Sequence, residues 1–377
     1  MNTDQALPLL GNLSPDQFMR RHWQRKPLLV RQAIPGFQPF LDRRELAALA
    51  EREDVESRLI TSGTAKGWTF AKGPFPKSKL PAWKQAQWTL LVQGVDLHDE
   101  RVHALMQQFR FIPDARLDDV MISYASDGGG VGPHFDSYDV FLLQAQGRRR
   151  WRIGRQKDLG LVEGLPLKIL ADFQPEEEHV LEPGDMLYLP PRWAHDGVAV
   201  GECMTYSIGF RQPWRGEVAR ELLQRLADEA TDLLGEQAYR DPRQPAVEAP
   251  GRIPAAMFDF AQDALRRALA DPRQTAMLMG EWLTEPKPNV WFEPGQPGRG
   301  DAACVLDRRT RMMYDDQHLF INGESYRAAG RDASLMRRLA DARRLDAADV
   351  ARLSVAAREL LHEWRQAGWV HEPGADA

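Results

Sequence analysis

The chain has 377 residues, more than one ordinary hydrophobic core holds, so two or three domains are expected. Its 43% hydrophobic and 27% charged content is typical of a soluble globular protein, and the net charge of −5 argues against a broad nucleic-acid surface. No apolar run reaches membrane-helix length, and "MNTDQALPLLGNLSPDQF" lacks a signal peptide's basic and apolar regions, so a cytoplasmic protein without membrane contact is expected.

The first part of the chain, residues 1–57, is predicted to be a mainly helical entry region. Ser14 followed by Pro15 is a typical helix start, with the serine as N-cap and the proline at the first helical position. The run "PLLV" at 27–30 predicts a first strand, and residues 41–57 predict a second helix.

Residues 58–214 have the pattern of an all-β domain. Short β-rich runs are separated by Gly, Pro and Asp: "WTLLVQGVDL", "DDVMISYAS", "YDVFLLQAQG", "RRRWRIG", "HVLEPGDMLYLPP" and "ECMTYSIGF". No helical pattern alternates with these runs, which argues against a parallel α/β sheet. A double-sheet jelly roll, the double-stranded β-helix of cupins, is the predicted core.

Two further regions complete the predicted organisation. Residues 215–285 are helical, and "GEVARELLQRLADEATDLLG" places its leucines on one stripe. That stripe is either the core of a helical subdomain or a homodimer interface. Residues 286–377 follow a Pro- and Gly-rich linker and alternate short strands and helices, which predicts a small winged-helix-like α+β domain.

The stretch "GPHFDSYD" and the later "PPRWAHDG" contain the candidate metal site. His134 and Asp136 share one face if the segment is a strand, and His195 follows Asp136 by 59 residues, far enough to return across a jelly roll. The glycines of "SDGGGVGPH" are expected to leave room for a ligand. Two imidazoles and one carboxylate form the facial triad of non-haem Fe(II) oxygenases.

Cysteine usage supports a site made of histidine and carboxylate. Only Cys203 and Cys304 are present, about a hundred positions apart, which excludes a disulfide framework and a thiolate-rich zinc centre. The remaining histidines have no comparable neighbours and are expected to be structural or exposed. They are His22, His98, His103, His179, His318, His362 and His371.

The segment "GRRRWRIG" offers an anchor for a 2-oxo acid co-substrate. Alternation places Arg149 on the apolar face with Trp151 and Ile153, while the other arginines face outward. A cation on a buried face requires an anionic partner, so Arg149 is predicted to bind a carboxylate, with a structural ion pair as the alternative. Thr205 and Ser207 are candidate hydroxyl helpers, unless they only pack within their strand.

These motifs, together with "FMRRHWQRKPLLV" near the start, resemble the JmjC-type ribosomal oxygenases, with the greatest likeness to bacterial members that hydroxylate an arginine of a large-subunit ribosomal protein at C3. The resemblance extends over nearly the whole chain. It implies Fe(II) at His134, Asp136 and His195, 2-oxoglutarate at Arg149, and dioxygen as co-substrate. It also implies a cytoplasmic homodimer that acts on a ribosomal protein. Tyr138, on the expected face of the metal-binding pair, is a candidate substrate-binding residue, unless it packs inside the barrel.

Other functions stay open at this point. Some relatives in this family hydroxylate histidine, so the type of side chain that is modified follows less firmly from the resemblance than the hydroxylation reaction does. The same site could also demethylate an N-methylated lysine or arginine. A third alternative is a non-catalytic JmjC protein that binds ribosomes or nucleic acid through the winged-helix-like end. The helix "DASLMRRLADARRL" carries several arginines, but interleaved acids favour a solvated face.

Overall fold

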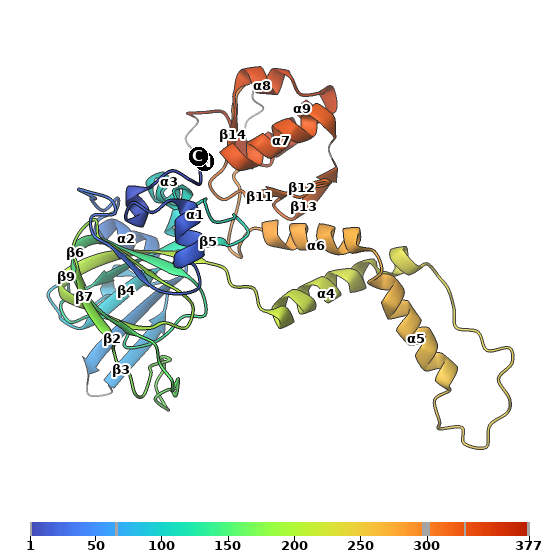
Figure 1. The fold of residues 1–377 in the computed structure, drawn as a ribbon, viewed down its shortest axis with the longest axis horizontal. Helices are drawn as coiled ribbons and strands as arrows, with labels where there is room; N and C mark the ends of the chain where they lie inside the picture. The colour runs from blue at the N-terminus through green and yellow to red at the C-terminus, as the bar shows by residue number, and fades with distance from the viewer. Residues whose placement is uncertain (1, 65–66, 296–301, 328, 375–377) are drawn as a thin grey trace. The chain divides into compact units, whose positions relative to one another are not determined.

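The computed structural model describes residues 2–64, 67–295, 302–327 and 329–374 (Figure 1). Its internal contacts divide the chain between Gln212 and Pro213 into two units. Among the described helices, no segment combines the length and the hydropathy that a membrane span requires.

The first unit contains a large sheet, whose strands differ in length, and a few short helices. Its strands are β1 (Leu28–Val30), β2 (Ser57–Thr64), β3 (Gly67–Lys72), β4 (Trp88–Val92), β5 (Leu117–Ala125), β6 (Val140–Gly154), β7 (Glu177–Leu181), β8 (Met186–Leu189) and β9 (Ala194–Phe210). Its helices are α1 (Pro15–Arg21), α2 (Arg43–Ala50) and α3 (Glu100–Gln107), with single 3-10 turns η1 (Pro8–Leu10), η2 (Lys77–Lys79) and η3 (Val95–Leu97).

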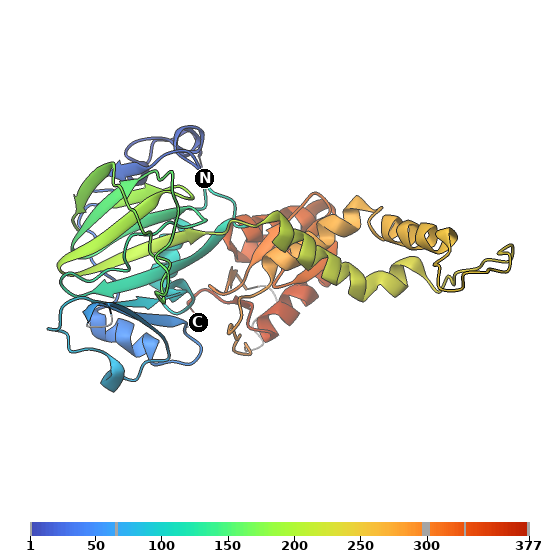
Figure 2. The ribbon, with the colours of Figure 1, turned by 90° about the horizontal axis from the view of Figure 1, so that it is seen from below.

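The nine strands pair antiparallel in the order β1-β8-β6-β9-β5-β4-β2-β3, and β7 pairs with the second half of β6. Figures 1 and 2 show this sheet strongly twisted and curled around its own interior. The long strands β6 and β9 form its centre, so side chains that alternate inward from both strands meet inside the curl. The curled sheet agrees with the predicted jelly roll, and it also includes β1, which lies in the predicted entry region.

The first helix of the entry region begins where its capping residues predict. Ser14 accepts a hydrogen bond from the Gln17 amide, and the Gln17 side chain returns one to the Ser14 amide, which completes a capping box. The strand predicted at "PLLV" is β1. The second helix, α2, is shorter than expected: it ends at Ala50, and turns follow before β2 begins at Ser57.

The main core lies between α1 and the sheet and is rich in aromatic side chains. Phe18 of α1 is fully buried, 5.4 Å from the Phe141 ring and 5.0 Å from the Tyr188 ring. Burial of such rings dominates core energetics at roughly 25 cal/mol per Å² of apolar area. This packing fixes β6 and β8, the strands that flank the candidate site.

Two local features differ from the sequence-based prediction. The runs "YDVFLLQAQG" and "RRRWRIG" form one strand, β6, which bends at register shifts around Gly147. Gly147 has φ +64°, and a Cβ there would lie 2.1 Å from the Glu202 carbonyl oxygen, so only glycine fits this bulge. The β2–β3 hairpin and α3 were not predicted.

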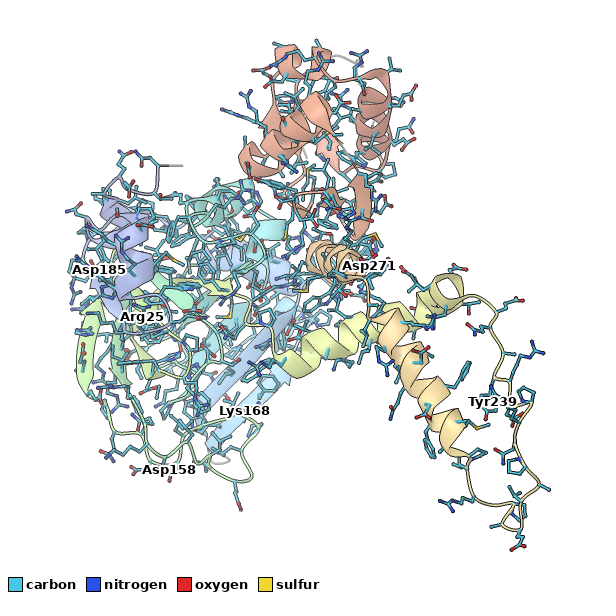
Figure 3. The ribbon with its side chains drawn as sticks, turned by 45° about the vertical axis from the view of Figure 1, so that its right-hand side comes forward. Arg25, Asp158, Lys168, Asp185, Tyr239 and Asp271 are labelled. Atoms are coloured by element: carbon cyan, nitrogen blue, oxygen red, sulfur yellow. The ribbon has the colours of Figure 1, made fainter. Side chains whose placement is uncertain are left out.

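The second unit contains three longer helices followed by a small α+β module. The helices are α4 (Arg215–Leu234), α5 (Ala255–Ala268) and α6 (Pro272–Thr284). The module consists of β10 (Cys304–Leu306), β11 (Met312–Tyr314), β12 (His318–Ile321), β13 (Glu324–Arg327), α7 (Gly330–Ala342), β14 (Arg344–Leu345), α8 (Ala347–Ala351), α9 (Val355–Gln366) and β15 (Val370–His371). Figure 3 labels Tyr239 on the long loop between α4 and α5, which interrupts the region 215–285 that was predicted to be helical.

The module has its own core, in agreement with an independent winged-helix-like domain. Leu335, Met336 and Leu339 of α7 pack with Leu361 and Trp364 of α9, all at most 5% exposed. Cys203 and Cys304 are both buried free thiols. The four-part division at 57, 214 and 285 stays a prediction, although its second boundary lies close to the division between the two units.

Candidate metal and co-substrate site

The two site histidines lie side by side because their backbones form an isolated antiparallel bridge. The His134 amide donates to the His195 carbonyl at 2.9 Å, and the His195 amide donates to the His134 carbonyl at 2.7 Å. Their ring centroids are 4.3 Å apart. The segment before β6 is therefore attached directly to the start of β9.

Both imidazoles present the same nitrogen to the interior. The Nδ1 atom of His134 lies 2.8 Å from the Gly132 carbonyl oxygen, and that of His195 lies 2.9 Å from the Trp193 carbonyl oxygen. A carbonyl oxygen only accepts, so each Nδ1 carries the proton and each Nε2 of the neutral ring keeps its lone pair. Backbone carbonyls that fix the tautomer in this way are usual for metal-binding histidines.

Asp136 completes the group. Its Oδ2 atom lies 3.7 Å from His195 Nε2, and one nitrogen or oxygen atom from each of the three residues lies within 4.8 Å of the others. In the described part of the chain, no other group of three His, Cys, Asp or Glu side chains converges in this way.

His195 is held in its neutral form. Burial, followed by repulsion from His134, lowers the pKa of His195 to about 4, although the Asp136 carboxylate acts in the opposite direction. A neutral imidazole is the form that binds a metal ion, so at neutral pH this side chain needs no deprotonation.

The reason for the convergence differs from the predicted one. His134 is a single bridge residue and residues 135–139 lie outside any strand, so strand alternation does not align His134 with Asp136. The Asp136 carbonyl oxygen instead accepts a hydrogen bond from the Arg192 amide at 2.7 Å. A loop held by neighbouring backbone therefore places the carboxylate.

The glycines before His134 also act differently from the expectation. A Cβ on Gly129 would lie 2.4 Å from the Trp88 carbonyl oxygen, and one on Gly130 would lie 2.6 Å from the Gly197 carbonyl oxygen. Gly132 has φ +78°, and a Cβ there would lie 3.0 Å from Ile169 of the β6–β7 connection. These glycines allow backbone segments to pack closely, which is a structural requirement rather than open space for a ligand.

Arg149 lies on the buried face of β6, as the alternation of side chains along a strand predicts, and is 3% exposed. Its guanidinium donates to the Ser123 hydroxyl at 3.1 Å, the Thr205 hydroxyl at 3.3 Å and the Gly197 carbonyl at 3.2 Å, and its Nε has no acceptor. No carboxylate of the described residues pairs with it, so the alternative of a structural ion pair is not supported. A buried guanidinium with spare donors is suited to an anionic ligand.

The two candidate hydroxyl helpers are in different positions. Thr205 contacts Arg149 and also donates to the Gln144 side chain at 3.1 Å. Ser207 is buried on the same face of β9, and the described residues include no hydrogen bond from its hydroxyl. Ser123 of β5 was missed in the sequence, although it occupies an inward position of the predicted strand "DDVMISYAS".

Trp151 is a second residue that the motif search did not assign to the site. Its ring lies 5.1 Å from the Arg149 guanidinium carbon and 5.8 Å from the His195 ring. It covers Gly197, where a Cβ would lie 2.6 Å from the indole. Trp151 was predicted only as an apolar inward neighbour, and the pairing of β6 with β9 brings it between the histidine and the arginine.

Tyr138 lies in a bend before β6, outside the strand face predicted for it, and is 39% exposed. Partial burial and the nearby Asp136 carboxylate raise the pKa of its phenol. The exposed fraction of 39% does not support the alternative that Tyr138 packs inside the barrel, and the raised pKa keeps its hydroxyl neutral at physiological pH.

The remaining histidines do not contribute to such a group. His179, His318 and His371 each lie near one carboxylate, at 2.9, 3.3 and 3.0 Å. The outer arginines of β6 are less uniform than predicted, because Arg152 forms an ion pair with Asp196 at 2.6 Å.

The donor set fits one divalent transition-metal ion with a neighbouring anion. Two imidazole nitrogens and one carboxylate oxygen converge, which is the ligand set of non-haem iron oxygenases. Arg149 provides a cation within the same curl of the sheet.

Comparisons with known proteins agree with this geometry. Residues 104–218 match the model of the JmjC domain, and residues 262–371 match that of the ROXA-like winged helix. The ribosomal protein uL16 3-hydroxylase of Escherichia coli K12 is 37% identical over 287 residues, which cover 75% of this chain and 74% of that protein. Human ribosomal oxygenase 1 is 26% identical over 360 residues, 81% of this chain and 54% of that protein.

Solved structures of Escherichia coli YcfD are similar over almost the full length. One has a TM-score of 0.82 at 30% identity and covers 95% of this chain and 97% of its own. A complex of YcfD with cobalt and 2-oxoglutarate has a TM-score of 0.79 at 31% identity, with 96% and 98% covered. The jelly-roll core and the winged-helix end are thereby confirmed, and the chain belongs to the JmjC-type ribosomal oxygenases.

Proposed function

We propose that this chain is an Fe(II)- and 2-oxoglutarate-dependent dioxygenase that hydroxylates an arginine of a large-subunit ribosomal protein at C3. The observation that carries the proposal is the convergence of His134, Asp136 and His195 beside the buried cation of Arg149. The similarity to the uL16 3-hydroxylase and to YcfD in complex with cobalt and 2-oxoglutarate supports it.

Each site residue has a defined role in this proposal. His134, Asp136 and His195 would hold Fe(II), since two histidines and one carboxylate are the ligand set of the oxygenases that activate dioxygen at non-haem iron. Bound iron, with 2-oxoglutarate as the electron source, supplies the oxidising power for attack on an unactivated C–H bond. Arg149 anchors the far carboxylate of 2-oxoglutarate, Thr205 orients the guanidinium, and Ser207 lines the same face.

The protein also controls where the reaction occurs. The carbonyls of Gly132 and Trp193 keep both imidazoles in the tautomer that binds metal. Tyr138, exposed and near Asp136, is the proposed contact for the protein substrate. A phenol at the edge of the site can pack against the substrate side chain and hydrogen-bond to it.

A homodimer is part of the proposal. Helix α5 has no fully buried residue, and its Phe258 and Leu265 are 54% and 64% exposed. Leu223 of α4 and Leu269 after α5 are each 51% exposed. Large apolar side chains exposed on two helices that contact each other favour an association surface. A cytoplasmic location follows if the substrate is a ribosomal protein.

The test is an intact-mass assay on ribosomal proteins incubated with the chain, Fe(II), 2-oxoglutarate and air. One ribosomal protein should gain one oxygen atom, and tandem mass spectrometry should place it on C3 of an arginine. His134→Ala and Asp136→Ala should abolish the gain, whereas His179→Ala, which alters an exposed pair, should retain it.

The outcomes separate the alternatives. Oxygen on a histidine would identify a histidine hydroxylase, and formaldehyde release from methylated peptides would identify a demethylase. No mass change combined with no decarboxylation of 2-oxoglutarate would favour a non-catalytic binding protein.

The arginines in and directly after α7 give little support for nucleic-acid binding. Arg338 forms an ion pair with Asp349, Arg337 donates to the carbonyls of Asp315 and Asp316, and Arg343 donates to the carbonyl of Thr310. Cations already engaged inside the module are less available to phosphates.

A further inference from the structure

We propose that Arg192 is a positioning residue, whose left-handed backbone conformation holds Asp136 and His195 in the geometry that the metal site requires. This inference rests on the proposed function. It concerns the turn Pro190–Trp193, in which the Trp193 amide donates to the Pro190 carbonyl at 3.3 Å and Arg192 has φ +65°. A proline in the second position and a positive φ in the third are the pattern of a type II turn, where glycine is the usual third residue.

The turn contacts both candidate ligands through its backbone. The Arg192 amide donates to the Asp136 carbonyl at 2.7 Å, and the next residue, Trp193, accepts the Nδ1–H of His195 at 2.9 Å. The first contact places the loop that carries the carboxylate, and the second fixes the imidazole tautomer. A change of conformation at residue 192 would therefore disturb two of the three ligands at once.

Asp136 depends on this contact because the sheet does not hold it. The residue lies between the single bridge at His134 and the start of β6 at Val140, in a segment without strand pairing. Among the described backbone hydrogen bonds, the Asp136 carbonyl accepts only the one from the Arg192 amide.

The identity of residue 192 shows that the conformation is imposed by its surroundings. A left-handed φ is unfavourable for any residue with a Cβ, and the Arg192 side chain is exposed and makes no ion pair with the described part of the chain. Proline at 191 and the hydrogen bond to Asp136 favour the strained form. Strained conformations that neighbouring structure over-determines are found mostly at functional sites.

Cobalt(II) binding, followed by visible absorption under anaerobic conditions, tests the inference on the full chain. Arg192→Gly keeps the amide and takes a left-handed φ without strain, so it should bind cobalt at least as tightly as the wild type. Arg192→Val adds a β-branched side chain at this φ and should weaken cobalt binding by about tenfold, with a changed absorption spectrum.

Arg343→Val is the matched control, because Arg343 also has a left-handed φ, of +56°, but ends α7 in the second unit. It should lower the melting temperature and leave the cobalt affinity and spectrum unchanged. A wild-type cobalt affinity and spectrum in Arg192→Val would overturn this inference but not the proposed metal site. A tenfold loss of cobalt affinity in Arg192→Gly would do the same. A wild-type chain that binds no cobalt would overturn the proposed metal site, and the inference with it.

Discussion

Replacement of Arg149 by methionine tests whether a buried cation is retained for a ligand rather than for folding. The substitution keeps an unbranched side chain of similar length and removes the charge. In the protein, Arg149 is 3% exposed, and the hydrogen bonds of its guanidinium, at 3.1 to 3.3 Å, all go to neutral oxygens. A buried charge without an opposite charge costs folding free energy.

The expected effects have opposite directions. Two charge-assisted hydrogen bonds to a ligand carboxylate contribute about 3 kcal/mol, so Arg149→Met should raise the Kd for 2-oxoglutarate by about two orders of magnitude. The free energy of unfolding should stay the same or rise by about 1 kcal/mol. The hydroxyls left behind keep partners, because Ser123 still donates to the Thr205 carbonyl and Thr205 to the Gln144 side chain.

Titration calorimetry with 2-oxoglutarate in the presence of manganese, and urea denaturation without ligand, measure the two quantities. Arg148→Met, one residue earlier on the exposed face of β6, is the matched control and should change neither. Unchanged 2-oxoglutarate affinity in Arg149→Met would refute the anchor. A loss of more than about 2 kcal/mol of unfolding free energy would show that the cation serves folding instead.

Three further predictions concern acid, packing and association. The folded-state pKa of His195 is about 4, below its ordinary value of 6.5, so the unfolded chain binds the proton at a higher pH than the folded chain does. The metal-free protein should therefore lose about 3 kcal/mol of unfolding free energy between pH 6.5 and pH 4, as measured by urea denaturation. Gly197→Ala places a Cβ 2.6 Å from the Trp151 ring and should weaken both cobalt and 2-oxoglutarate binding by at least tenfold in titrations. Leu265→Glu puts a charge on the exposed apolar face of α5 and should convert a dimer to a monomer in sedimentation velocity at micromolar concentration.

Each of these has a control or a contrary outcome. His195→Gln should remove most of the acid sensitivity, and an equally steep pH profile in that variant would assign it to other groups. Gly216→Ala, where a Cβ meets nothing within 4 Å, should leave both ligand affinities unchanged. A wild-type chain that sediments as a monomer would remove the dimer from the proposal.

Short-range patterns in the sequence determined much of the local structure. Ser14 and Pro15 predict the start of α1, because capping and the fixed φ of proline act within one turn. Alternation along "RRRWRIG" places Arg149 inside, because the side-chain period of a strand is two and β6 is regular there. The residue types His, Asp and His with an inward arginine were sufficient to predict the chemistry.

The tertiary structure decided how those side chains meet. His134 and Asp136 do not share a strand; a backbone bridge to His195 and the turn at Arg192 bring them together. Ser123 and Trp151 join the site because β5 and β6 pair with β9 in a particular register, and that register is not encoded by any local pattern. The sequence alone therefore determined which side chains can form the site, because local propensity and strand alternation act over a few residues. Their geometry required the folded sheet, because contacts between residues far apart in the chain set it.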